Sequence, residues 1–298
     1  MKELQIIDHI RKRAGKPAGR VKLGIGDDCA VIQYSRDKYL LWAQDMLVDG
    51  THFELGKEDL NLIGRKAVSV NISDIAAMGG VPEYITAAIG VPGSLRAKDI
   101  RKIYNGVFDV CNEYGIKVVG GDTNRSEKLV IDVSIIGFVE KSRLATRSGA
   151  KKGDVVFITG PVRDGKKEHL TFTPRLKESC FLTKRYKINA MIDVSDGIAM
   201  DIYRICSESR VGCVLEEDKI RLSKQLKLKD ALYYGESFEL LFTMSSVEAD
   251  RLIKKSEDKK TNCFRIGNIV ERKNGIKMIW KDGKIGKLEV RGYRHVRP

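Results

Sequence analysis

The sequence predicts an α/β (α+β) fold divided into two domains, and three observations support this. The chain has 298 residues, whereas one domain typically holds roughly 100–200. Strand-like apolar runs alternate with segments of helical periodicity along the chain. A polar, glycine-containing stretch over residues 140–154 interrupts this alternation. We therefore expect an N-terminal domain of residues 1–142 and a C-terminal domain of residues 143–298.

The N-terminal half begins with MKELQIIDHIRKR, whose apolar residues lie between charges and predict a short amphipathic helix. Two β-rich runs then flank the polar turn SRDK, and Pro92-Gly93 ends a third run. Apolar residues at helical spacing predict two long helices. The predicted elements are strands at 31–34 and 39–44, a helix at 58–78, a strand at 83–91, a helix at 97–114, and strands at 116–119 and 129–140.

The C-terminal half restarts with the apolar strand VVFITG, followed by a loop at 161–167 that has little periodicity. Helices and strands then alternate again. The predicted elements are a helix at 175–186, a strand at 189–194, a helix at 197–209, strands at 213–217 and 238–244, a helix at 246–256, and two or three C-terminal strands.

The formal net charge is +14, but lysines and arginines are spread along the whole chain and no nucleic-acid-binding motif accompanies them. We therefore expect a solvated basic surface that attracts polyanionic ligands, and no nucleic-acid partner. No run approaches the ~20 apolar residues of a membrane span, and the N-terminus lacks a cleavage site. These features favour the cytoplasm and no membrane partner. The six cysteines show no C-x-x-C spacing, which excludes a typical zinc motif.

Aspartates recur at or near the predicted ends of elements. The turn GIGDDCAV contains Asp28, and the segment MIDVSDGIAM contains Asp193 and Asp196. Asp45 follows a predicted strand, and Asp122 follows a strand and two glycines. Ligand sites in α/β folds form at strand ends. Each aspartate alone has a structural interpretation, because Asp also caps helices and forms turns.

A sixth aspartate, Asp74, lies inside a helix of small and apolar residues, three positions after Asn71. If several of these carboxylates converge, each like-charge pair at ~4 Å repels by about 4 kcal/mol at an effective dielectric of ~20. Cations or protonation must then compensate. Oxygen ligands without a His/Cys cluster favour Mg²⁺, which usually also holds phosphate oxygens. Convergence therefore predicts a metal–nucleotide site, although the P-loop and protein-kinase motifs are absent.

The ordered motifs GIGDDCAV, DMLVDGTHF, KAVSVNISDIAAMGGVP, GGDTNRS, TRSGAKKGD and IDVSDGIAMD resemble those of the thiamine-monophosphate kinase family. The resemblance runs from about residue 20 to the C-terminal GYRHV. It implies a two-domain aminoimidazole ribonucleotide synthetase-like architecture with mixed sheets, flanking helices and a homodimer formed by the N-terminal domain. It also implies transfer of the γ-phosphate of ATP to thiamine monophosphate, with several Mg²⁺ ions bridging aspartates and phosphates.

Matched motif by motif, the resemblance implies roles for individual residues. The implied magnesium ligands are Asp28, Asp45, Asp74, Asp122, Asp193 and Asp196. The implied ATP contacts are Gly121, Asp122, Arg147 and Ser195. The implied thiamine-phosphate pocket contains His52, Glu236 and Tyr293. We assign no general base, because phosphoryl transfer depends on positioning and on cations rather than on covalent chemistry.

The chain departs from the family pattern at several places. Gln44 replaces the usual Thr before the strand-end Asp, and Ser237 replaces an acid within YGESFEL. The stretch after Gly160 is shortened, and HLRPxPR is reduced to FTPRLKES. These departures leave two alternatives open: an ATP-dependent enzyme of the same superfamily with another small acceptor, or an ATP-binding homologue with impaired catalysis.

Overall fold

The apolar alternation of the first half forms a six-stranded mixed sheet with the order β1-β2-β3-β6-β4-β5. The computed structural model describes residues 3–256 and 262–293, so Met1, Lys2 and the RHV of GYRHV lie outside the described residues. The elements of this half are α1 (Glu3–Ala14), β1 (Val21–Leu23), β2 (Ala30–Gln33), β3 (Lys38–Val48), α2 (Leu60–Ala77), β4 (Val81–Val91), α3 (Ala97–Tyr114), β5 (Lys117–Arg125) and β6 (Val130–Glu140).

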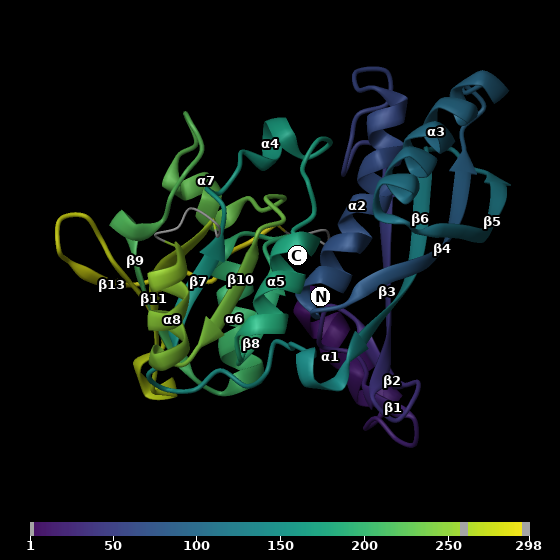
Figure 1. The fold of residues 1–298 in the computed structure, drawn as a ribbon. Helices are drawn as coiled ribbons and strands as arrows, with labels where there is room; N and C mark the ends of the chain where they lie inside the picture. The colour runs from purple at the N-terminus through teal and green to yellow at the C-terminus, as the bar shows by residue number, and fades with distance from the viewer. Residues whose placement is uncertain (1–2, 257–261, 294–298) are drawn as a thin grey trace.

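One face of this sheet is covered by α2 and α3, and the other face is open (Figure 1). In β3, Leu41, Ala43 and Leu47 are buried towards the helices, whereas Trp42 and Met46 remain about half exposed. This is the period-2 alternation of a half-buried strand. The sheet is therefore an amphipathic layer whose apolar core lies between it and the two helices.

Helices α2 and α3 approach each other closely because glycines lie at their contact. A Cβ on Gly64 would lie 2.0 Å from the backbone oxygen of Ile103, and one on Gly106 would lie 1.8 Å from that of Asn61. Asp59 caps α2, because its side chain accepts hydrogen bonds from the backbone N–H groups of Asn61 and Leu62. The position of α2 against the sheet is therefore fixed at its first turn and along its contact with α3.

The second half forms a seven-stranded mixed sheet with the order β13-β12-β9-β11-β7-β10-β8. Its elements are η1 (Lys141–Arg143), β7 (Val155–Thr159), α4 (Gly165–Glu168), α5 (Leu176–Arg185), β8 (Ala190–Asp193), α6 (Ile198–Ser209), β9 (Gly212–Glu216), η2 (Glu217–Lys219), α7 (Leu228–Tyr233), β10 (Leu240–Met244), α8 (Ser246–Ser256), β11 (Cys263–Val270), η3 (Arg272–Asn274), β12 (Ile276–Ile279) and β13 (Ile285–Lys287).

Both faces of this sheet are covered, so its central strands are buried throughout. Along β7, Val156 and Ile158 pack into a core with α6 and α7, whereas Val155 and Phe157 pack into a core with α5 and α8. A strand that is covered on both faces has a continuous apolar sequence, and VVFIT in β7 has this pattern.

Helix α2 lies between the two halves, because it also contacts α5 and β8. Most of its residues are therefore buried, including the polar Lys66, Asn71 and Ser73. The chain folds so that a polar segment of α2 faces the end of β8, the edge strand of the second sheet. Among the described residues, no helix combines the length and the apolar character needed to cross a bilayer.

Candidate metal and nucleotide site

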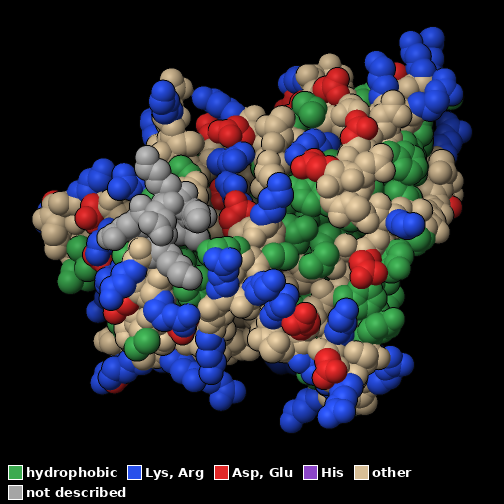
Figure 2. All heavy atoms as spheres, in the orientation of Figure 1, with side chains coloured by type: hydrophobic (Ala, Val, Ile, Leu, Met, Phe, Trp, Pro, Cys, Tyr) green, Lys and Arg blue, Asp and Glu red, His purple; other side chains and the backbone are tan. Residues whose placement is uncertain are grey.

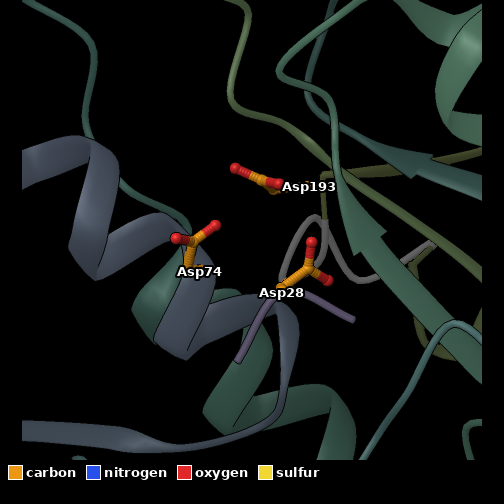
Figure 3. A group of neighbouring side chains, drawn as sticks. All are labelled: Asp28, Asp74 and Asp193. Carbon is orange, nitrogen blue, oxygen red and sulfur yellow. The ribbon is translucent and has the colours of Figure 1, made fainter. Parts of the chain in front are cut away.

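Three carboxylates from distant parts of the chain converge between the two halves. Asp28 lies in the turn before β2, Asp74 on α2, and Asp193 at the end of β8. One carboxylate oxygen from each lies within 4.8 Å of the others. In Figure 3 the three side chains surround a common space, approached from three separate elements. The convergence predicted for these three residues is therefore present.

The local backbone holds Asp28 and Asp193 in place. Gly26 adopts φ +127°, which allows the tight turn that presents Asp27 and Asp28. The backbone N–H of Arg147 donates to the Asp27 carboxylate at 3.0 Å, and its guanidinium donates to Asp28. On the opposite side, Ser73 Oγ donates to Asp193 Oδ2 at 2.6 Å. Groups from both halves therefore fix the positions of the carboxylates.

Protein cations compensate the charges of Asp74 and Asp193 poorly. Burial, followed by the neighbouring Asp45 and Asp193, raises the pKa of Asp74 well above its ordinary value. Burial and Asp28 likewise raise the pKa of Asp193. Burial, followed by Asp28, raises the pKa of Asp27 to about 7. The cluster therefore binds protons or cations more readily than separate carboxylates do.

The donor set suits Mg²⁺. All the ligand atoms are carboxylate oxygens, which hard divalent cations prefer, and the group contains no His or Cys. Asp28 Oδ2 is buried and has no hydrogen-bond partner among the described residues. A buried carboxylate oxygen without a donor is costly unless a cation satisfies it. The cluster therefore has both the chemistry and an unsatisfied atom for a bound cation.

The cluster opens into a cavity of about 920 Å³ between the halves. A cavity of this size lies within the usual range for cofactor and small-molecule sites. Besides the three clustered aspartates, most of the other predicted site residues line it: Asp45, His52, Arg147, Ser195, Asp196, Glu236 and Tyr293. The structure therefore brings together residues that the sequence separates by more than 260 positions.

Asp196 lines this cavity but is bonded to an arginine that the sequence analysis did not single out. Arg204, on α6, contacts Asp196 through one guanidinium nitrogen and Asp201 at 2.6 Å through another. Asp201 is fully buried, and burial raises its pKa to about 7 although Arg204 opposes the shift. Arg204 is therefore the resident counter-ion of Asp196.

Gly121 and Asp122 lie elsewhere in the single chain. Both are in β5, an edge strand, and neither lines the cavity. Gly121 is in register with Asp45 across β4 and β6, so three strand spacings of about 4.8 Å separate them by about 14 Å. The Asp122 carboxylate accepts hydrogen bonds from the Thr123 N–H and from Asn124.

The expectation that Asp45 and Asp122 follow the ends of strands was wrong. Strand β3 continues to Val48, because β6 pairs with it along its whole length, and β5 continues to Arg125 by pairing with β4. Two glycines in GGDTN suggested a turn, but neighbouring strands supply the hydrogen bonds that keep this segment extended.

The residues expected to bind the acceptor form one end of the cavity. His52 lies in the turn after β3, where its Nδ1 accepts from the Val48 N–H at 3.0 Å. The Tyr293 hydroxyl donates to the Thr51 backbone oxygen at 3.5 Å. The Tyr293 ring meets the Tyr234 ring edge to face, with 6.4 Å between centroids. Tyr234 also lines the cavity, and sequence reasoning missed it because tyrosines most often simply pack.

Helix α1 also borders the cavity. Its residues Ile7, Asp8 and Arg11 line the space, and Arg11 forms a two-pronged hydrogen bond to Glu208 at the end of α6. Charge does not single out this region, because Figure 2 shows Lys and Arg side chains scattered over both lobes. The cavity is therefore distinguished by its carboxylates rather than by a basic patch.

Comparison with known proteins gives a consistent result. Residues 26–139 match the family model of the AIR synthase related protein N-terminal domain, and residues 140–279 match that of its C-terminal domain. Thiamine-monophosphate kinase of Buchnera aphidicola subsp. Acyrthosiphon pisum is 34% identical, with 98% of each chain covered. Thiamine-monophosphate kinase of Bacillus subtilis is 31% identical, with 99% of each covered.

A solved structure described as AaThiL complexed with AMPPCP and TMP superposes with a TM-score of 0.83. It is 30% identical in sequence, and the match covers 99% of this chain and 97% of the solved chain. The predicted fold class, a two-domain architecture of mixed sheets with flanking helices, is therefore confirmed.

Proposed function

Because the chain belongs to the thiamine-monophosphate kinase family, we propose that it phosphorylates thiamine monophosphate to thiamine diphosphate with ATP as the phosphoryl donor. The observation that carries the proposal is the convergence of Asp28, Asp74 and Asp193 at a cavity that also holds the expected acceptor residues. The residues proposed to bind the metal and those proposed to bind the acceptor line the same cavity, which supports the proposal.

Magnesium would be held first by the three clustered aspartates, and Asp45 and Asp196 line the same cavity. When bound, Mg²⁺ would neutralise the charge of the triphosphate and of the transferring phosphoryl group. The residues of the chain would position the reactants. Arg147 would offer a forked contact to phosphate oxygens, and Ser195 also lines the cavity.

The acceptor would lie at the other end, beside His52, Glu236 and Tyr293. Its phosphate then faces the γ-phosphate of ATP across the aspartate cluster, which permits direct in-line transfer. We assign no general base, because the phosphate of the acceptor is itself a competent nucleophile. Aligning two anions therefore requires cations and fixed geometry rather than a proton acceptor.

We also propose that the N-terminal half forms a homodimer. Trp42 and Met46 lie on the open face of its sheet, 49% and 54% exposed. The outer edge of β5 has no strand partner in the described chain, and β2 pairs with β3 only as far as Trp42. Exposed edges of this kind readily pair with another chain. Pairing of β5 with the later part of β3 in a second copy would cover both edges.

This assembly would account for Asp122. The register places Asp122 level with Ala88 on the open face of the sheet. Gln44 and Met46 lie on the same face of β3 and line the cavity. If β5 of one protomer lies beside the later part of β3 in the other, the partner subunit's Asp122 and Gly121 reach this end of the cavity. The metal and ATP assignments of these two residues are thus compatible with their distance from the cluster within one chain.

The departure at Ser237 lies outside the cavity, whereas Gln44 lines it. Ser237 is 3% exposed, and its hydroxyl donates to the Val194 backbone oxygen at 3.4 Å. It does not line the cavity, so the acid replaced at this position is not missing from its wall. This observation favours an active kinase over a homologue that only binds ATP.

The test is the release of ADP by the purified chain with ATP, Mg²⁺ and a panel of phosphorylated and unphosphorylated acceptors. We expect turnover with thiamine monophosphate, formation of thiamine diphosphate, and loss of both when Mg²⁺ is chelated. Turnover with another acceptor alone would support a different enzyme of the superfamily. Tight ATP binding with no turnover on any acceptor would support a binding protein.

A further inference from the structure

Lys66 is an unusual residue in this molecule, because its side chain is 0% exposed although it carries a charge. Lysine is almost never fully buried unless it is paired. Lys66 lies in the middle of α2 and does not itself line the cavity. Its environment therefore has to be explained by its partners.

The ammonium group of Lys66 meets three acceptors, which matches its three N–H donors. It donates to the His52 backbone oxygen at 2.9 Å, to the His169 Nδ1 at 3.0 Å, and to the Glu236 carboxylate. Lys66 and His52 belong to the N-terminal half, whereas His169 and Glu236 belong to the C-terminal half. Lys66 therefore joins the two halves of the molecule at one point.

The contact with His169 defines the state of that imidazole. An ammonium group can only donate, so Nδ1 accepts and the ring proton lies on Nε2. Nε2 then donates to Glu58 Oε1 at 3.1 Å. Burial, followed by the charge of Lys66, lowers the pKa of His169, which favours this neutral form. The network thus has a donor and an acceptor for each bond.

Glu236 is the member of the network that reaches the cavity. Its backbone has φ +56°, a left-handed conformation that is uncommon for a non-glycine residue. The Glu236 N–H donates to the Ser195 backbone oxygen at 2.9 Å, which holds this conformation. The hydrogen bond to Ser195 therefore fixes the backbone of Glu236, and Lys66 fixes the position of its carboxylate.

From these contacts we propose that Lys66 is a positioning residue for the acceptor end of the site. It holds the Glu236 carboxylate and the turn containing His52 in the arrangement that receives the acceptor. The proposal rests on the function proposed above, because it requires an acceptor to bind beside these two residues.

The geometry predicts that Lys66 acts on the acceptor and not on ATP. Its partners are residues expected at the acceptor end, whereas Arg147, which is expected to contact ATP, bonds to Asp27 and Asp28. The side chain of Glu236 is 24% exposed. Without Lys66, its carboxylate can therefore turn towards water rather than remain buried and unpaired, so the main loss is of position.

The experiment compares Lys66→Met, Lys66→Arg, Glu236→Gln and the double variant Lys66→Met/Glu236→Gln in the full chain. Lys57→Met is the matched control, because Lys57 forms an exposed ion pair with Glu54 close to the same turn. The readouts are kcat, the KM for thiamine monophosphate, the KM for ATP and the melting temperature.

We expect Lys66→Met to raise the acceptor KM by about tenfold or more, the effect of losing one charge-assisted hydrogen bond. The ATP KM should change less than about twofold. Lys66→Arg should restore part of the loss, because it keeps the charge in a tighter space. The double variant should lose less than the sum of the two single effects, because the two residues are coupled. Lys57→Met should behave as the wild type.

An unchanged acceptor KM in folded Lys66→Met, or an equal rise in both KM values, would overturn the proposal. If Lys66→Met does not fold, Lys66→Arg and Glu236→Gln provide the test. Each of them should raise the KM for thiamine monophosphate without raising the KM for ATP. If either variant leaves the KM for thiamine monophosphate unchanged, the proposal is wrong. A wild-type chain that neither binds nor phosphorylates thiamine monophosphate contradicts the proposed function, and this inference with it. Wild-type turnover with unaffected variants contradicts the inference alone.

Discussion

Ser73 on α2 donates a 2.6 Å hydrogen bond to Asp193 at the end of β8, and both side chains are buried. This bond joins the N-terminal half of the chain to the C-terminal half within the aspartate cluster. Asp74, the next residue of α2, supplies another carboxylate to the same cluster. The proposed metal site therefore forms only when the two halves are docked.

The carboxylate cluster should cost stability when no cation is bound. At 4.8 Å and an effective dielectric of ~20, one pair of ionised carboxylates repels by about 3 kcal/mol. Asp74→Asn should therefore raise the melting temperature by several degrees in chelator at pH 8 and abolish the further rise given by Mg²⁺. Calorimetry checks both effects, with exposed Asp282→Asn as the control. If Asp74→Asn melts at a lower temperature than the wild type in chelator, and Mg²⁺ still raises its melting temperature, the cluster is not the metal site.

Mixing inactive variants should reveal whether two chains share one site. Asp28→Asn and Asp122→Asn should each abolish turnover as homodimers. If the partner subunit's Asp122 completes each site, subunit exchange in an equal mixture yields half mixed dimers, each with one intact site. About a quarter of wild-type activity should then return, whereas either variant alone should stay inactive. If Asp122 instead acted in the site of its own chain, every site in a mixed dimer would carry one defect and no activity would return. An absence of recovery despite subunit exchange would therefore contradict a shared site.

Arg147 should act on ATP through its forked guanidinium. Its backbone N–H bonds to Asp27 and is independent of the side chain, so Arg147→Lys keeps that contact and a positive charge near Asp28 but loses the fork. The KM for ATP should rise by about tenfold, as expected for one charged hydrogen bond, with the KM for thiamine monophosphate unchanged. Arg143→Lys, on a neighbouring surface turn, is the control for kinetics. If the KM for ATP is the same in Arg147→Lys, Arg143→Lys and the wild type, Arg147 does not contact ATP.

The neutral His169 between the halves should make stability depend on pH. Burial and Lys66 lower its pKa below the ordinary 6.5, although Glu236 and Glu58 oppose the shift. Below pH 6.5 His169 binds a proton in the unfolded chain but stays neutral in the folded chain. The free energy of unfolding therefore decreases as the pH falls, until the pH reaches the lower pKa that His169 has in the folded chain. The melting temperature of His169→Gln should fall less between pH 7.5 and 5.5 than that of the wild type. Parallel curves for His169→Gln, wild type and the surface control His9→Gln would disprove this.

Long, strongly periodic elements were predictable from the sequence. The helix predicted at 97–114 is α3 with the same bounds, because Ile103, Val107 and Val110 face the core and Gly115 ends the helix at φ +70°. Short elements were missed: β1 has three residues and α7 has six, which gives too little periodicity to detect. The loop expected at 161–167 overlaps the four-residue helix α4, whose start is capped by Asp164.

The site was predictable only where residues recur in ordered motifs. Asp28, Asp74 and Asp193 lie in such motifs, and the structure brings them together. Lys66 and Arg204 carry no sequence signal, because a single basic residue on a helix is usually solvated and only tertiary packing shows otherwise. The position of Asp122 within a strand was also not predictable, because a sequence does not show which neighbouring strands keep a glycine-rich segment extended.

The outer edge of β5 and the open face of the first sheet also bear on what happens to a newly synthesised chain. Until another copy covers them, β5 presents an edge that no strand of the described chain pairs with, and the sheet face exposes apolar side chains such as Trp42. Such surfaces recruit any extended peptide, including misfolded copies of the same protein. Prompt assembly would therefore protect the molecule from aggregation, and substitutions that slow assembly should reduce the soluble yield in cells before they alter the chemistry of the cavity.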